Sequence, residues 1–429
     1  MSNTVLINGD CFEALDKLED NSIGSVVSDP PYLINFMNKG WDNENNIAGN
    51  PELYKKLITK MKAGSYVALF GHSRTHHRIM VALEEAGFEL RDTLTWLYGS
   101  GFPKNHNIGK AIDKKLGGKR EVISTRPLQG NGKTMKSGFH QPDGTGKGNT
   151  IKQDVFEITA PATDEAKEWE GYGTALKPAV EFIVLAQKPR DGTFVNNVLT
   201  HGVGGLNIDG CRINYNGEVP NAGGRANHGR GDGYGYKAMG DTIAPNTDGR
   251  FPANLILDEE AGRMLDEQSG TTKTVANKNY KWNNKKCEGD TFTSRGTYTP
   301  REGKGGASRF FYCPKVSKKE RELGCDELEE KTRTRVNAGG LENDPKFAPV
   351  QNRNDHPTLK PVSLMRWLVR LTTPPNETCL DLFMGAGSTG GACALEGRDF
   401  IGVERDEHYF EIATARIEAW KKEAENEEN

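Results

Sequence analysis

The sequence predicts an α/β fold organised around an open, mostly parallel sheet. Short aliphatic or β-branched runs alternate with stretches of helical periodicity, both in the first hundred residues and near the C-terminus. The run at 23–28 leads into Asp29-Pro30-Pro31-Tyr32, and the run at 378–383 leads into Met384-Gly385-Ala386-Gly387. Because ligands of open parallel sheets bind at the carboxyl ends of the strands, both loops are candidates for one site.

The expected elements alternate along the chain. Strands are expected at 5–7, 23–28, 65–70, 90–98, 179–186, 378–383 and 400–403. Helices are expected at 11–18, 51–61, 73–86, 362–371, from near 388 onward, and at 406–422, with a frayed Glu/Asn tail. A flap is expected at 35–42, and apolar islands at 203–208, 251–257 and 310–313 interrupt a loop-rich stretch.

Composition limits the class of protein. The chain has 429 residues, a net charge of −3 and a pI of about 6.4, so any nucleic-acid contact must come from local basic patches. Its seven cysteines show no Cys-x-x-Cys pair, which favours reduced thiols in a cytosol and no metal site. His72, His76 and His77 are interpreted as surface or packing residues. No apolar run approaches the roughly 18 residues of a membrane span, and the N-terminus does not begin a signal peptide, so a cytoplasmic location is expected.

The loop Asp29-Pro30-Pro31-Tyr32 suggests a particular chemistry. The two prolines hold Asp29 and Pro30 extended, so the Asp29 carboxylate and the Pro30 carbonyl can point at one place. Tyr32 offers a face for stacking a planar ring. The exocyclic amine of adenine or cytosine, with two N–H donors on a flat ring, fits this arrangement. Binding both hydrogens would favour attack by the nitrogen. The alternative is a rigid loop after a strand.

The glycine-rich turn near the C-terminus suggests a nucleotide-like cofactor. Gly385 and Gly387 allow close backbone approach, and the following helix directs N–H groups at a ligand. Glu404, about 20 residues later at the tip of the next strand, is placed to accept both hydroxyls of a ribose. Asp10, at another strand tip, suits either a cofactor contact or a helix N-cap. The turn lacks the full G-x-G-x-x-G pattern, which favours S-adenosylmethionine, with polar contacts from Ser388, Thr389, Thr358 and Lys360.

The middle of the chain has a different character. Residues 99–168 are rich in Gly and Lys, and such a segment either tracks phosphates or is a solvated insertion. Basic residues interleaved with aromatics, as at 273–286, suit strand separation and base stacking. These changes in composition divide the chain into a first core part (1–104), a basic insertion (105–170), a core strand (171–190), a loop-rich region (191–355) and a last core part (356–429).

Three motifs together resemble the DNA amino-methyltransferases in their β-type order. They are Asp29-Pro30-Pro31-Tyr32, His356-Pro357-Thr358-Leu359-Lys360-Pro361 and the stretch from Asp381 to Gly387. Phage and prophage DNA methylases are particularly similar, over roughly residues 4–104, 175–190 and 356–412. The resemblance implies a Rossmann-like, seven-stranded methyltransferase sheet with permuted motif order. It also implies that 1–104 is the catalytic part of the core, 191–355 the target-recognition region and 356–429 the cofactor-binding part of the core. Met384 stands where the family commonly has alanine, and the middle region matches no known recognition domain.

The resemblance also implies roles for individual residues. Those expected to act on a flipped-out base are Asp29, Pro30, Pro31 and Tyr32. Those expected around S-adenosylmethionine are Asp10, Asp29, His356, Thr358, Lys360, Asp381, Phe383, Gly385, Ala386, Gly387, Ser388, Thr389 and Glu404. The expected partner is double-stranded DNA at the nucleoid, with neither membrane nor metal, and a homodimer stays open.

Three alternatives to adenine methylation remain. Asp29, rather than Ser, at the first motif position favours N6 of adenine over N4 of cytosine. A protein glutamine methyltransferase also acts on an amide with two N–H donors, but in those enzymes the glycine turn comes first. The third alternative is a DNA-binding protein with an inactive core, which the complete set of chemical residues in both motifs disfavours.

Overall fold

The computed structural model describes residues 2–34, 47–99, 101, 105–127, 155–215, 249–274, 303–314, 318–333 and 350–428. The chain divides into two compact units. We call Met1–Gly99, Val180–Glu320 and Leu359–Asn429 the sheet unit, and Ser100–Ala179 with Arg321–Thr358 the insert unit. The expected division of the chain at residues 104, 170, 190 and 355 stays a prediction. The expected flap at 35–42 and the stretches 128–154, 223–240 and 275–286 lie outside the described residues.

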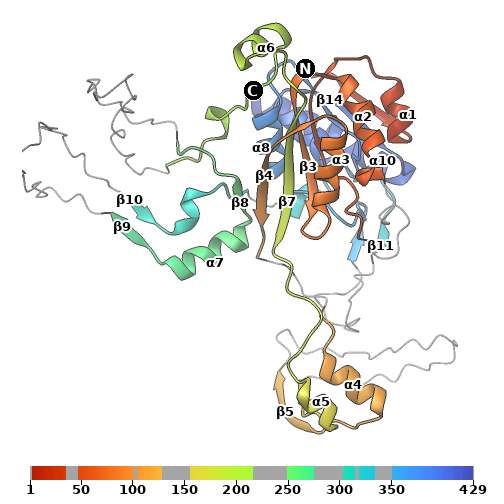
Figure 1. Ribbon diagram of the computed structural model, residues 1–429, viewed down its shortest axis with the longest axis vertical. Coiled ribbons are helices and arrows are strands. Elements are labelled where there is room, and N and C mark those ends of the chain that lie inside the picture. The colour runs from red at the N-terminus through yellow and green to blue at the C-terminus, as the bar shows by residue number, and fades with distance from the viewer. Residues whose placement is uncertain are drawn as a thin grey trace, which may run out of the picture. The chain divides into compact units, whose positions relative to one another are not determined.

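Eight strands form the central sheet in the order β1-β14-β13-β2-β3-β7-β4-β8 (Figure 1). They are β1 (Thr4–Asn8), β2 (Ile23–Ser28), β3 (Met61–His72), β4 (Glu89–Leu97), β7 (Val180–Gln187), β8 (Leu255–Leu257), β13 (Thr378–Asp381) and β14 (Asp399–Glu404). All neighbours are parallel except at β7, which runs antiparallel to β3 and β4. The predicted fold class is confirmed. β8 adds one strand to the expected seven and comes from the apolar island at 251–257.

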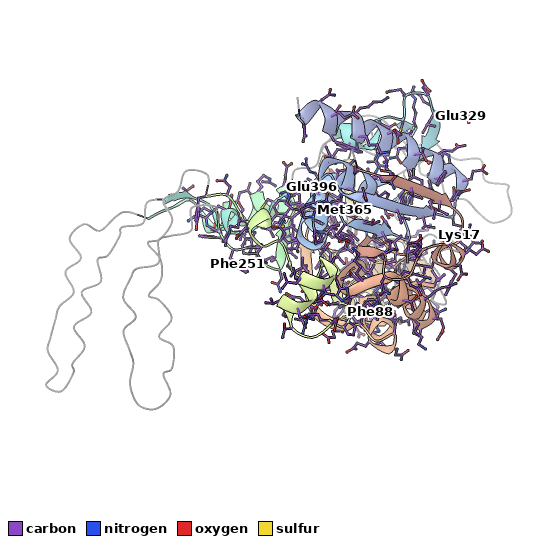
Figure 2. The ribbon with its side chains drawn as sticks, turned by 90° about the horizontal axis from the view of Figure 1, so that it is seen from above. Lys17, Phe88, Phe251, Glu329, Met365 and Glu396 are labelled. Carbon is purple, nitrogen blue, oxygen red and sulfur yellow. The ribbon has the colours of Figure 1, made fainter. Side chains whose placement is uncertain are left out.

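Helices cover both faces of the sheet. One layer contains α1 (Cys11–Asp16), α2 (Pro51–Lys60) and α3 (His76–Glu85), and the other contains α8 (Val362–Thr372), α9 (Ser388–Leu395) and α10 (Glu407–Glu428). Each layer packs against its own buried apolar cluster, so β2 contributes Val26 to one cluster and Val27 to the other. Phe88 and Met365 accordingly lie on opposite sides of the sheet (Figure 2).

The remaining elements surround the sheet or belong to the insert unit. In the sheet unit they are η3 (Ile47–Gly49), α6 (Phe194–His201), η4 (Asp209–Cys211), α7 (Glu259–Ser269), β9 (Thr272–Thr274), β10 (Gly303–Gly305), η5 (Ala307–Phe310) and η6 (Lys318–Arg321). In the insert unit they are α4 (Ile108–Leu116), β5 (Val122–Pro127), β6 (Val155–Thr159), α5 (Asp164–Glu168), β11 (Lys331–Arg333) and β12 (Val350–Asn352). None of the helices in the described ranges is long and apolar enough to cross a membrane.

Local sequence explains where several helices begin and end. Asp10 caps α1 by accepting a hydrogen bond from the backbone N–H of Phe12, and Asn50 caps α2 immediately before Pro51. The expected frayed tail is wrong, because α10 continues to Glu428. Its end is rich in Glu, Lys and Ala, which are good helix formers. A Lys421–Glu418 ion pair adds local support.

Candidate active site

The two sequence motifs lie at one edge of the sheet. β2 pairs directly with β13, with Ser25 opposite Cys379 and Val26 opposite Leu380. The loops that follow these parallel strands therefore start side by side, although more than 350 residues separate them. The Ser28 hydroxyl donates to the Asp381 carboxylate and ties the two strand ends together.

Asp29 has one carboxylate oxygen engaged and one unengaged. Its Oδ2 accepts a hydrogen bond from Nζ of Lys360 at 2.6 Å. Its Oδ1 is buried and has no hydrogen-bond partner among the described residues. Burial raises the pKa of Asp29, while the positive charge of Lys360 lowers it. A buried acceptor without a donor is costly, so this oxygen is suited to a ligand N–H.

Lys360 lies against Asp29, and its expected contact with the methyl donor stays a prediction. We expected its ammonium at the amino-acid end of the methyl donor. Its side chain is 7% exposed and contacts Asp29 at 2.6 Å and Glu181 at 3.5 Å. Burial lowers the pKa of Lys360, but the two carboxylates outweigh this and raise it overall. The lysine therefore remains a cation inside the site.

Tyr32 is fixed at both ends. Its hydroxyl donates to Oε2 of Glu181 at 2.8 Å, and its carbonyl accepts from the Thr75 hydroxyl at 2.5 Å. Burial and the nearby carboxylates raise its pKa well above the ordinary value, so the hydroxyl stays protonated. Pro30 is buried, and Pro31 and the Tyr32 ring are partly exposed. Leu33, next in the chain, has a φ of 60°, an uncommon conformation for a non-glycine residue.

The glycine-rich turn has the backbone that its sequence predicts. Gly385 and Gly387 have φ of 52° and 78°, where side chains are disfavoured. A Cβ on Gly387 would lie 3.1 Å from Cα of Ala413, so the turn also packs tightly on α10. The backbone N–H of Gly385 donates to Oε2 of Glu404 at 2.8 Å. Glu404 is thereby held beside the turn, and burial raises its pKa.

Asp381, Ser388 and Thr389 are engaged within the protein. Asp381 is 2% exposed and accepts from the hydroxyls of Ser28 and Thr389 and from the backbone N–H of Phe383. Burial raises its pKa to about 6. The Ser388 hydroxyl donates to the Lys360 carbonyl at 2.9 Å. These hydrogen bonds fix the three side chains at the turn, and their expected contacts with a ligand stay predictions.

The sequence around this site matches a known protein family. The sequence profile of a DNA methylase family, that of the N6 and N4 methyltransferases, matches residues 23–415. The chain belongs to this family of DNA methylases.

Individual relatives of the methylase match over shorter stretches or at low identity. The Type II methyltransferase M.HinfI of Haemophilus influenzae is 36% identical over 67 residues, 16% of this chain and 19% of the relative. The Type II methyltransferase M.BglI of Bacillus subtilis is 35% identical over 71 residues, which are 17% of this chain and 20% of the relative. The chain thus spans about a fifth of the length of these curated relatives.

Two solved structures resemble the methylase over nearly their whole length. The complex of M1.HpyAVI with S-adenosylmethionine is 15% identical and covers 96% of this chain and 99% of its own, with a TM-score of 0.36. The cytosine-N4-specific PvuII DNA methyltransferase is 12% identical, with a TM-score of 0.40. The match covers 99% of this chain and 94% of the PvuII enzyme.

Two side chains of the methylase that sequence reasoning did not select also shape the site. Glu181 contacts both Tyr32 and Lys360. Arg416 is fully buried and donates to the carbonyls of Ala386 and Glu320, so it holds the glycine-rich turn from α10. The sequence does contain a signal for Arg416, because this arginine lies among the buried apolar residues Ile412, Ala413 and Ile417 of α10.

Asp10, His356 and Thr358 were also predicted to contact the cofactor. Asp10 caps α1, and its carboxylate retains capacity for a second hydrogen bond. His356 and Thr358 belong to the insert unit, so their contact with a cofactor stays a prediction. Among the described residues, no group of three or more His, Cys, Asp and Glu could hold a metal ion. His76 stacks on Phe182 with ring centroids 4.4 Å apart, as a packing histidine does.

Proposed function

We propose that this DNA methylase transfers a methyl group from S-adenosylmethionine to an exocyclic amino group in double-stranded DNA. The supporting observation is the buried Oδ1 of Asp29, which has no hydrogen-bond partner among the described residues. Asp29 directly follows β2, and β2 pairs with β13, the strand that leads into the glycine-rich turn. One site thus offers an acceptor for an aromatic amine and a backbone suited to a nucleoside. Such a protein would work in the cytoplasm at the nucleoid.

The residues of the glycine-rich turn fit the methyl donor. Gly385 and Gly387 leave the backbone open to close approach, and Glu404 is held at the turn with lone pairs left for ribose hydroxyls. Phe383, partly buried beside the turn, offers a face for an adenine ring. S-adenosylmethionine, when bound, supplies an electrophilic methyl group on a sulfonium.

The residues after β2 fit the acceptor base. Oδ1 of Asp29 and the carbonyl of Pro30 would each accept one hydrogen of the amino group, which shifts the lone pair of the nitrogen toward attack. The Tyr32 ring would stack on the base after it leaves the duplex. The proton of the methylated amine leaves afterwards through Asp29 or water. No strong base is needed, because the amine loses its proton only after the new bond forms.

We propose N6 of adenine as the target, with N4 of cytosine as the alternative. Asp29 at the first motif position supports adenine through the family resemblance. The protein glutamine methyltransferase and the inactive DNA-binding protein remain outcomes of the test.

The test uses tritiated S-adenosylmethionine and unmethylated duplex DNA, followed by digestion and identification of the labelled nucleoside. Label on N6-methyl-2′-deoxyadenosine from the wild type, and none from Asp29→Ala, supports the proposal. Asp20→Ala is the control, because Asp20 is an exposed partner of Lys60 before β2 and should keep full activity. Label on cytosine refutes the choice of base. Label in protein alone favours the glutamine enzyme, and DNA binding without label favours the inactive core.

A further inference from the structure

We propose that Glu181 is a positioning residue that aligns both the Asp29 carboxylate and the Tyr32 ring for methyl transfer. This inference rests on the proposed function and adds to it a residue outside the three motifs. Glu181 is assigned no contact with the base or with the cofactor. It acts through Lys360 and Tyr32.

The direction of β7 brings Glu181 to the site. Glu181 is the second residue of β7, opposite His72 at the end of β3 and Trp96 near the end of β4. In an antiparallel strand the first residues lie at the edge where its parallel neighbours end. Glu181 therefore reaches the edge that carries the Asp29 loop, although 149 residues separate it from Tyr32.

One oxygen of Glu181 contacts two groups of the site. Oε2 accepts the Tyr32 hydroxyl at 2.8 Å and lies 3.5 Å from Nζ of Lys360. The same ammonium lies 2.6 Å from Oδ2 of Asp29. The side chains of Lys360, Asp29 and Glu181 are 7%, 18% and 20% exposed, so solvent screens these contacts only in part. Two carboxylates thus share one cation, and the shared cation leaves Oδ1 of Asp29 for the amine.

The negative charge of Glu181 acts on Asp29 through the short distance between the two carboxylates and Lys360. It is one of the causes that raise the pKa of Asp29, after burial and against the opposing charge of Lys360. The other titratable groups around these side chains are Tyr32 in the loop, Tyr98 after β4, His72 at the end of β3 and Asp381 on β13. Removing only the charge of Glu181 should therefore lower the pKa of Asp29.

Two variants separate the charge of Glu181 from its hydrogen bond. Glu181→Gln keeps an amide oxygen for the Tyr32 hydroxyl and removes the charge. Glu181→Leu removes both and leaves the buried hydroxyl without its acceptor. The matched control is Glu377→Gln, which breaks a part-buried lysine–glutamate pair with Lys62 at the opposite edge of the sheet.

The readouts are the pH profile of kcat/KM for methyl transfer to DNA and the Kd of S-adenosylmethionine. The profile of kcat/KM reports ionisation in the free enzyme. In Glu181→Gln the acid limb should move to lower pH by about one unit, because Asp29 then ionises more readily. In Glu181→Leu, kcat should fall by about tenfold, because the Tyr32 ring loses the acceptor that holds it in place beside the reacting amine. Both variants should bind S-adenosylmethionine with the wild-type Kd, which also shows that they fold. Glu377→Gln should match the wild type in every readout.

A wild-type acid limb in Glu181→Gln together with wild-type kcat in Glu181→Leu would overturn the inference. So would an equal shift in Glu377→Gln, because the effect would then be a general one of lost charge. Absence of methyl transfer by the wild type itself overturns the proposed function, and the two failures are therefore distinguishable.

Discussion

Lys360→Met is the most informative perturbation of stability in this site. It removes the one cation that lies within 4 Å of both Asp29 and Glu181 among the described residues. Methionine preserves much of the volume of the lysine stem, so packing should change little. The variant leaves two carboxylates in a part-buried site without their shared counter-ion.

The expected loss of stability depends on pH. Removing one partner of a buried ion pair costs about 3–5 kcal/mol. Asp29 can reduce this cost by binding a proton, since its pKa should rise further without Lys360, and each unit of pKa corresponds to about 1.4 kcal/mol. We therefore expect a loss of about 3 kcal/mol at pH 8 and about 1 kcal/mol at pH 5. In the wild type, the pKa of Lys360 is higher in the folded than in the unfolded protein. The stabilisation that its positive charge gives to the folded state is therefore complete below its ordinary pKa, and it is lost only as pH rises above that pKa.

Urea unfolding at pH 5, 6.5 and 8 measures this difference. Lys56→Met is the control, because its pair with Asp16 is largely exposed and should contribute less than about 1 kcal/mol at every pH. In the double variant Lys360→Met/Asp29→Asn, the second change should recover most of the loss at pH 8. Equal destabilisation of Lys360→Met at pH 5 and pH 8, or no recovery in the double variant, would refute the reasoning.

Two further predictions concern the glycine-rich turn and its neighbour. Gly387→Ala should cost about 2–3 kcal/mol in urea unfolding, because it combines a left-handed backbone with a Cβ only 3.1 Å from Cα of Ala413. Gly117→Ala, with φ of 74° and no atom within 4 Å of its Cβ, should cost only about 1 kcal/mol, and equal costs would contradict the packing argument. Asp381→Asn tests the buried carboxyl whose pKa is about 6, against 3.8 as its ordinary value. Because the native carboxyl binds its proton more tightly than the unfolded one, wild-type stability should fall by about 2 kcal/mol as pH rises from 4 to 6. Unfolding measurements should show that the variant lacks this fall, and an identical pH slope would contradict the assignment.

The sequence predicted the arrangement of the two motifs because that arrangement follows from strand order. The apolar runs before Asp29 and within 378–383 both identified buried strands, and both are present as β2 and β13. Parallel neighbours end at a common edge, so two loops that are distant in sequence could be assigned to one site. The left-handed Gly385 and Gly387 were likewise predictable, because only glycine adopts such backbone readily.

The partners of individual side chains were not predictable in the same way. An apolar run such as that of β7 does not specify strand direction, and the antiparallel direction is what brings Glu181 to the site. The long side chain of Lys360 can reach either the cofactor or Asp29, and the choice depends on where β7 and the Asp29 loop lie. The hydroxyls of Ser388 and Thr389 were assigned to a ligand, but the sequence did not show that the Lys360 carbonyl and the Asp381 carboxylate accept hydrogen bonds from them. Arg416 required knowledge that α10 packs on the glycine-rich turn.

The central claim is that Asp29 acts on the base while the glycine-rich turn binds the methyl donor. The most direct measurement is single-turnover methyl transfer by Asp29→Ala, together with the Kd of S-adenosylmethionine for the same variant. We predict a Kd within about threefold of the wild type and a transfer rate lowered by at least about a hundredfold, as for loss of an interaction made in the transition state. Transfer at the wild-type rate would contradict the account.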